Sequence, residues 1–311
     1  MNFNEPAVAA DYIASHALLA LLLLTLAGSV LSGLVWHAIL KAGPSIWTAV
    51  LRLWMNLAGD RAMHMMQSVR YVGPAFKGTL SAARFLGIYA LCSFIVALLA
   101  VGTFLELADA IDVDDELTQF DVALSKAMGR HVSDDLLRTL SLTTHLGDSA
   151  VLAVLAVAMV VVLFLRREQM LAWACLVAAI GGGTLTLVLK QHFARSRPLR
   201  EHEFAVVSGY SFPSGHASGA MLVYGLLGYL IVRHTRPQWH IPVVVVIMGM
   251  IVFVGGSRIL LQVHFLSDVL AGWTSAAAWL ALWVAGLEAV RRRNSPQRLS
   301  DATPVRAPRQ A

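Results

Sequence analysis

The stretch Leu171–Pro198, LAWACLVAAIGGGTLTLVLKQHFARSRP, joins an apolar run to a cluster of basic residues. A helix needs roughly 20 mostly apolar residues to cross the hydrocarbon core of a bilayer. The apolar part of this stretch meets that length, and Lys190, Arg195 and Arg197 follow it directly. The pattern predicts a membrane helix that carries a row of cations at one membrane surface.

The rest of the chain repeats the apolar pattern. Hydrophobic residues make up 57% of the sequence and charged residues only 14%, whereas soluble domains carry about 25% charged residues. Mean hydropathy is +0.66. The sequence therefore predicts an all-α, polytopic membrane helix bundle. Seven runs are candidate spans: Ala17–Leu40, Phe85–Leu107, Ser149–Leu165, Leu171–Leu189, Gly215–Val232, Ile241–Gly256 and Val269–Val290.

Basic residues in the short loops set the expected orientation, because cytoplasmic loops are enriched in Lys and Arg. Arg166 and Arg167 join the third and fourth runs, Arg233 and Arg236 join the fifth and sixth, and further arginines follow the seventh. Placing these loops inside puts the N-terminus outside and Lys190 on the outer face. We expect a multi-pass protein of a bacterial inner (cytoplasmic) membrane with its site facing the periplasm or outside. The net charge of +5 then reflects loops and motifs, so nucleic acid is not an expected partner.

Two more polar stretches emerge on the same outer face. The first is PSGH, Pro213–His216, directly before an apolar run. Proline and serine in this position predict a helix start, where the free backbone N–H groups of Ser214 and Gly215 can bind an anion. His216 can then meet the leaving oxygen of a bound phosphate.

The second is SRILLQVHFLSD, Ser257–Asp268. His264 and Asp268 are four residues apart, which predicts that they share one helical face. A carboxylate that accepts from one ring nitrogen leaves the lone pair of the other free to attack. Arg258, with Lys190 and Arg197, would stabilise a phosphoryl group.

The three stretches match K-x6-R-P, P-S-G-H and S-R-x5-H-x3-D, and in this the chain resembles the type 2 phosphatidic acid phosphatase superfamily. That family includes membrane-bound lipid phosphate and diphosphate phosphatases, among them enzymes for undecaprenyl diphosphate and phosphatidylglycerophosphate. The resemblance implies that His264 is a nucleophile forming a phosphohistidine, that Asp268 orients it, and that His216 is the general acid and then the base. It implies these phosphate-binding residues: Lys190, Arg197, Ser214, Gly215 and Arg258.

The predicted organisation has three parts. Residues 1–84 hold the first span and a basic interfacial segment, residues 85–290 a six-span phosphatase core, and residues 291–311 a disordered cytoplasmic tail. Residues 108–148, within the core, should form one or two short helices on the outer surface, acting as a lid or as a solvated connector. At the edges of the site we expect Asp148 to cap the third span and Arg195 to snorkel at the membrane edge.

The expected function is hydrolysis of a phospholipid or polyprenyl phosphate or diphosphate at the outer face. Two alternatives stay open: a lipid phosphotransferase that uses the same site, and a lipid or anion transporter that uses only its cations. The motifs specify a phosphate; they specify neither the lipid that carries it nor the oligomeric state.

No cofactor or metal is expected, because the carboxylate-dense stretch Asp112–Glu116 has no accompanying histidine. We predict that phosphate release from a lipid phosphate persists in EDTA. The measurement is inorganic phosphate released by the detergent-purified protein with and without chelator. Activity that disappears in EDTA and returns on adding a divalent metal would contradict the metal-free mechanism.

Overall fold

The computed structural model describes residues 6–70, 76–111, 115–199, 204 and 207–294. Within these residues every regular element is a helix. The elements in chain order are α1 (Pro6–Ser15), α2 (Ala17–Arg70), α3 (Phe76–Asp109), α4 (Glu116–His131), α5 (Asp134–Thr143), η1 (Thr144–Gly147), α6 (Ser149–Leu165), α7 (Gln169–Phe193), α8 (Gly215–His234), η2 (Pro237–Trp239), α9 (His240–Leu260) and α10 (Leu266–Asn294).

The chain divides into two compact units. Residues 1–37 and 96–280 form the first unit, and residues 38–95 and 281–311 form the second. All three polar stretches lie in the first unit. The domain limits expected at residues 84 and 290 stay a prediction, and the expected disordered tail lies almost entirely outside the described residues.

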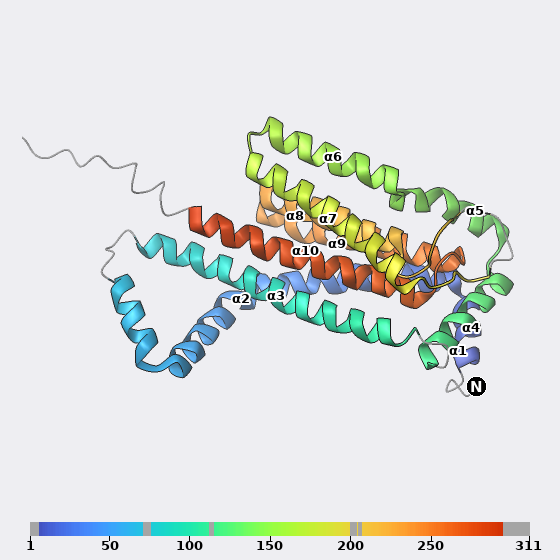
Figure 1. Cartoon of the computed structure of the whole chain (residues 1–311), viewed down its shortest axis with the longest axis horizontal. Coiled ribbons are helices and arrows are strands. Elements are labelled where there is room, and N and C mark those ends of the chain that lie inside the picture. Colours follow the sequence, from blue (N-terminus) through green and yellow to red (C-terminus); the bar gives the residue numbers. More distant parts are fainter. Residues whose placement is uncertain (1–5, 71–75, 112–114, 200–203, 205–206, 295–311) are drawn as a thin grey trace, which may run out of the picture. The chain divides into compact units, whose positions relative to one another are not determined.

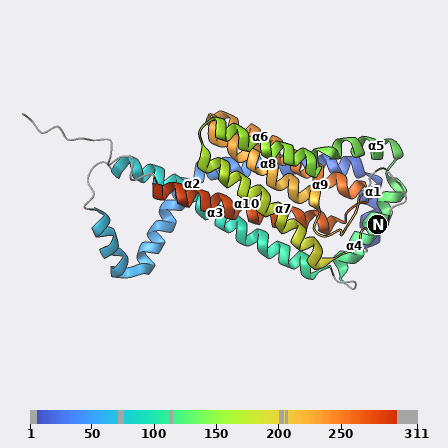
Figure 2. The ribbon, with the colours of Figure 1, turned by 45° about the horizontal axis from the view of Figure 1, so that its top comes forward.

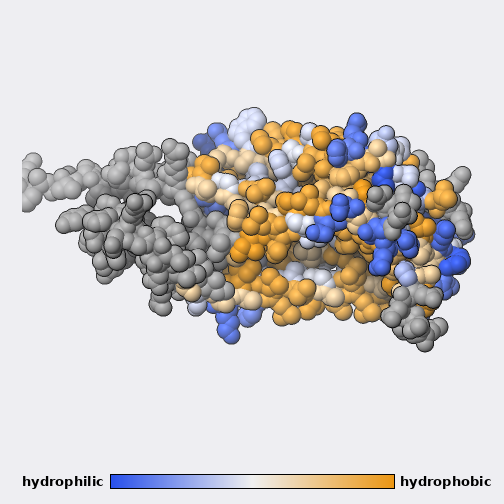
Figure 3. Space-filling view, turned by 60° about the horizontal axis from the view of Figure 1, so that its bottom comes forward, coloured by the Kyte–Doolittle hydropathy of each residue, from blue (hydrophilic) through white to orange (hydrophobic). Residues whose placement is uncertain are grey.

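Seven described helices are long and apolar enough to cross a membrane, which confirms the predicted all-α membrane fold. The run predicted at Ser149–Leu165 has the same bounds as α6. In Figure 3 apolar residues cover the middle of the bundle, and hydrophilic residues gather toward the end where α4 and α5 lie in Figure 1. This surface fits a bundle that is surrounded by lipid along its length.

Helices α7, α8 and α9 pack closely against α10, because glycines on each of them receive large side chains of α10. Figure 1 shows these helices in one bundle. The indole of Trp279 lies against Gly181 and Gly182, and its Nε1 donates to the carbonyl of Ala178 at 2.9 Å. Trp273 packs in the same way against Gly255. Small residues let membrane helices approach at backbone distance, so the glycine run of α7 is a packing feature.

The first span belongs to the same unit as the three motifs. Gly28 and Gly33 of α2 face Val252 and Val245 of α9, and Gly249 of α9 faces Ser29. The contact is again of the small-residue type found between membrane helices. The extra N-terminal span therefore packs directly against α9, the helix that leads into the third motif.

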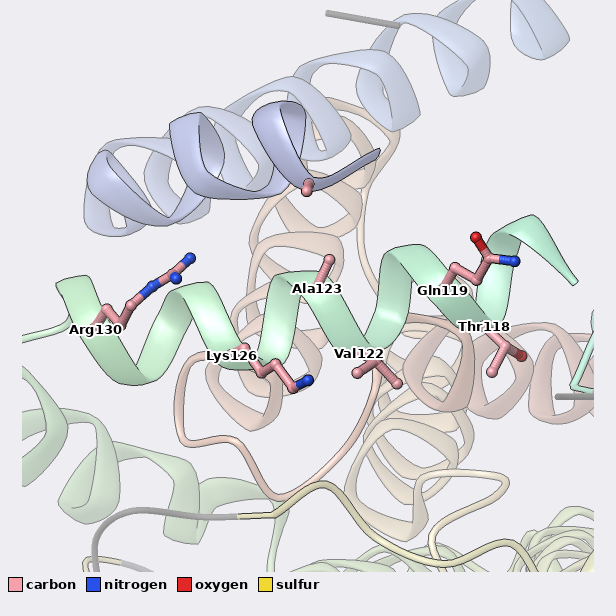
Figure 4. Close-up of a pocket in the computed structure, with 7 residues that line it drawn as sticks. Thr118, Gln119, Val122, Ala123, Lys126 and Arg130 are labelled. Atoms are coloured by element: carbon pink, nitrogen blue, oxygen red, sulfur yellow. The ribbon is translucent and has the colours of Figure 1, made fainter. Parts of the chain in front are cut away.

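Two short helices, α4 and α5, lie within residues 108–148, where the sequence predicted one or two. Their place on the outer surface stays a prediction. Asp115 caps α4 by accepting from the backbone N–H of Leu117 at 2.7 Å. Helix α1 packs on α4 (Figure 2), and Asp11 of α1 accepts from Arg130 at 2.8 Å. An open pocket of about 510 Å³ lies between α1 and α4 (Figure 4), lined by Ala7, Thr118, Gln119, Val122, Ala123, Lys126 and Arg130.

Gly272 of α10 offers a test of how closely the motifs are packed. A Cβ at this position would lie 2.8 Å from the carbonyl oxygen of Ser214 and 3.1 Å from the backbone nitrogen of Ser218. Backbone atoms cannot rotate away, so Gly272→Ala must push α8 from α10. We predict a loss of about 1–3 kcal/mol in the free energy of unfolding, together with reduced activity.

The measurement is thermal unfolding in detergent, with Gly183→Ala as the matched control. A Cβ on Gly183 meets nothing within 4 Å, so this variant should unfold no earlier than the parent. Equal stability of the two variants would mean that the contact between α8 and α10 tolerates a methyl group.

Candidate active site

The three polar stretches converge at one end of the first unit. The N–H of Ser214 donates to the carbonyl of Asp268 at 2.9 Å, which joins the second stretch to the third. Arg197 of the first stretch places its Nη1 3.2 Å from Nε2 of His264. Residues that are far apart in the sequence thus form one cluster, as the sequence predicted.

His264 lies at the centre of this cluster, and its side chain is 3% exposed. It precedes α10, which begins at Leu266, so the expectation that His264 and Asp268 share a helical face is wrong. A turn and a helix cap bring them together: Asp268 accepts from the N–H of Phe265 at 2.8 Å, as the acidic residue of a capping box does. The Nδ1 of His264 is then 3.5 Å from Oδ2 of Asp268.

The charge state of His264 follows from its surroundings. Burial lowers the pKa of His264 from 6.5 to about 3; Asp268 opposes this shift, while Arg197 and Lys190 add to it. The ring is therefore neutral at physiological pH. A proton on Nδ1, facing the carboxylate of Asp268, leaves the lone pair of Nε2 on the side of Arg197.

Backbone carbonyls fix the first two predicted cations. Arg197 donates to the carbonyls of Ser208, Gly209 and Val263 at 2.8–3.0 Å. Lys190 donates to the carbonyl of Tyr210 at 2.6 Å. These acceptors carry no net charge, so both side chains keep their positive charge for an anion.

Arg258 is buried, and its Nη1 donates to the hydroxyl of Thr144 at 3.1 Å. Its charge acts on the ring of His216, as does that of Arg197. The third predicted cation thus faces the predicted acid.

The start of α8 differs from the expectation in one respect. Ser214 is the N-cap, and its hydroxyl accepts from the N–H of Ala217 at 3.4 Å. Its own N–H is occupied by the carbonyl of Asp268, so that N–H does not serve as an anion donor. The first N–H groups of a helix have no partner within the helix, which leaves those of Gly215 and His216 for an anion.

Arg195 has a different place from the one expected. Its side chain is only 10% exposed, and it bridges two buried carboxylates: Nη1 lies 2.8 Å from Oδ1 of Asp268, and Nη2 lies 3.1 Å from Oδ2 of Asp121. The hydroxyls of Ser211 and Ser267 donate to Asp268 and Asp121, respectively. Burial raises the pKa of Asp121, and its bonds to Ser267 and Arg195 oppose that shift.

Two signals in the sequence point to these missed residues. Arg195 and Arg197 are two apart in a segment without helix, and in extended chain such residues point to the same side. Asp121 lies at helical spacing from Leu117 and Leu124, so it is a carboxylate on the apolar face of α4. An acidic residue on a buried face needs a cation.

Asp148 also departs from its expected role. It occupies the N-cap position of α6, but its side chain makes no capping hydrogen bond. Its carboxylate instead lies 2.8 Å from Nε2 of His216 and 2.6 Å from Nδ1 of His145. The predicted general acid therefore has a carboxylate partner of its own.

Comparisons with known proteins identify the family of this chain. A family model described as the PAP2 superfamily matches residues 171–292, a range that contains all three motifs. Phosphatidylglycerophosphatase B of Bacillus subtilis (strain 168) is 37% identical over 179 residues, which cover 55% of this chain and 84% of that protein. A crystal structure described as the first transmembrane PAP2 type phosphatidylglycerolphosphate phosphatase from Bacillus subtilis matches with a TM-score of 0.57 and 30% identity, covering 64% of this chain and 98% of that one.

Arg195→Met tests the buried charge cluster. The substitution keeps much of the volume but leaves Asp268 and Asp121, both fully buried, without their shared cation. Removing one partner of a buried ion pair costs about 3–5 kcal/mol, so we predict a loss of that order in the free energy of unfolding.

The control is Arg166→Met in the exposed loop between α6 and α7, which should unfold like the parent in the same detergent. If Arg195→Met were as stable as Arg166→Met, the two carboxylates would not depend on the guanidinium.

Proposed function

The chain belongs to the PAP2 superfamily, and from that premise we propose that it removes the terminal phosphate of a membrane lipid through a phosphohistidine on His264. The observation that carries the proposal is the setting of His264: a neutral, buried ring with Asp268 behind Nδ1 and Arg197 beside Nε2. This arrangement supports assigning His264 as the nucleophile, Asp268 as the carboxylate that orients it and Arg197 as a cation for the phosphate.

The first step transfers the phosphoryl group to the protein. The lone pair of His264 Nε2 attacks phosphorus while the bond from phosphorus to the lipid oxygen breaks, and His216 gives its proton to that oxygen. Lys190, Arg197 and Arg258 bind the equatorial oxygens, where the charge of a phosphoryl group in transfer is spread.

The second step restores the protein. His216, now neutral, takes a proton from water, and the resulting hydroxide attacks phosphorus as the bond to Nε2 breaks. Free phosphate leaves, His264 regains its lone pair, and His216 is again protonated. Each turnover therefore consumes one water and needs no further reactant.

We propose phosphatidylglycerophosphate as the lipid. The support is that the named relatives are a phosphatidylglycerophosphatase and a phosphatidylglycerolphosphate phosphatase. A panel that also contains phosphatidate and undecaprenyl diphosphate tests this, with the rate of phosphate release per substrate as the readout.

We also propose that the site faces outward. Arg166 and Arg167 join α6 to α7, Arg233 lies in the last turn of α8, and Arg236 directly precedes η2. These positions are at the helix ends opposite Lys190 and Ser214. Basic loops favour the cytoplasmic side, so the other end, with the three motifs, would lie outside.

Trapping the intermediate tests the mechanism. Rapid quenching with dioctanoyl phosphatidylglycerophosphate labelled in its terminal phosphate should give a labelled protein that is stable to alkali and labile to acid, as a phosphohistidine is. His264→Ala should remove both the label and turnover, because it removes the proposed phosphoryl acceptor. The control is His37→Ala, at an exposed position on α2, which should keep both the label and turnover. Label that survives in His264→Ala would reject the assignment of the nucleophile.

A further inference from the structure

We propose that a fourth stretch, Thr144–Asp148 (THLGD), belongs to the active site, and that within it Asp148 is the residue that orients His216 and stabilises its protonated form. The inference deepens the function proposed above and rests on it. It concerns the acid that protonates the departing lipid, for which the three motifs provide no partner.

The geometry around Asp148 is that of a second histidine–carboxylate pair. Oδ1 of Asp148 lies 2.8 Å from Nε2 of His216, and Oδ2 lies 2.6 Å from Nδ1 of His145. The first contact spans 68 positions of sequence. The side chain of His216 is 20% exposed and that of His145 is 63% exposed, so the row His216–Asp148–His145 runs from the partly buried acid toward solvent.

Gly147 makes room for this pair. A Cβ at Gly147 would lie 2.9 Å from Cδ2 of His216 and 2.5 Å from Cγ1 of Val254. The hydroxyl of Tyr224 in α8 also holds η1 in place, because it donates to the carbonyl of Leu146 at 2.7 Å. The ring of His216 therefore lies directly on the backbone of η1, which limits its rotation.

Thr144, at the start of the same turn, contacts the third motif. Its hydroxyl accepts from Arg258 Nη1 at 3.1 Å and from the hydroxyl of Ser257 at 3.0 Å. One five-residue stretch thus contacts both a phosphate-binding cation and the acid. It fixes the position of each relative to the other.

The pairing with Asp148 determines which nitrogen of His216 does the chemistry. A proton on Nε2 that is donated to Asp148 leaves Nδ1 as the atom that gives a proton to the lipid oxygen and later takes one from water. The proposed reaction needs a protonated His216 before the transfer, and both burial and the guanidinium groups of Arg258 and Arg197 oppose that positive charge. The carboxylate of Asp148 offsets them; His145 faces its other oxygen.

The leaving group provides the test. Diacyl phosphatidylglycerophosphate releases a weakly acidic alcohol, which needs a proton, whereas p-nitrophenyl phosphate releases a stable phenolate, which does not. The experiment measures the rate of phosphoenzyme formation in a single turnover with each substrate. The lipid substrate is dioctanoyl phosphatidylglycerophosphate. A general acid contributes about 10²- to 10⁴-fold, so Asp148→Asn should lower the ratio of the lipid rate to the nitrophenyl rate by about 10²-fold.

The ratio does not depend on how much of the variant is folded, because both rates come from the same active molecules. The alkaline limb of the lipid reaction should also move to lower pH in Asp148→Asn, since the imidazolium loses its counter-charge. Asp134→Asn, an exposed residue in the first turn of α5, is the matched control and should keep both the ratio and the pH profile.

If Asp148→Asn changes both rates by the same factor, so that their ratio is unchanged, the inference is overturned and the stretch has a purely structural role. The function itself is judged separately. If the unaltered protein forms no phosphoenzyme, the proposed function has failed; if it does and Asp148→Asn keeps its ratio, only the role of Asp148 has failed.

Discussion

The candidate site depends on one buried carboxylate. Asp268 has no exposed surface, and an ionised group in such a place is stable only when hydrogen bonds and opposite charge replace water. Arg195 from the first stretch, Ser211 beside the second, and the N–H of Phe265 in the third all donate to it. Satisfying this one charge brings three distant parts of the chain to the same place and at the same time orients His264.

The same network of charges extends to the end of the first unit where α4 and α1 pack together. Asp121 of α4 shares Arg195 with Asp268, and α4 in turn packs against α1, where Asp11 binds Arg130 and lies 3.1 Å from His131. Helix α4 is thus more than a solvated connector, because its Asp121 shares Arg195 with Asp268 in the candidate site. Helix α4 also borders the open pocket that it forms with α1.

Much of the fold could be predicted because its determinants are local. Span length and glycine-mediated packing can be read from consecutive residues. The seven predicted spans were confirmed, and residues 108–148 contain short helices as predicted. The partners of the charged residues could not be predicted in the same way. Asp121 pairs with Arg195 across 74 positions, and Asp148 pairs with His216 across 68. A local rule assigned Asp148 to helix capping, and tertiary contact gave it a histidine instead.

The close contact of Gly272 with the backbone of Ser214 and Ser218, together with the bond from Ser214 N–H to the Asp268 carbonyl, means that main-chain atoms set the spacing between α8 and α10. His216 at the start of α8 and Asp268 in the first turn of α10 are thus held at a separation to which these main-chain contacts contribute directly. In the proposed reaction, residues that line the path of the lipid chain can therefore vary without altering this separation.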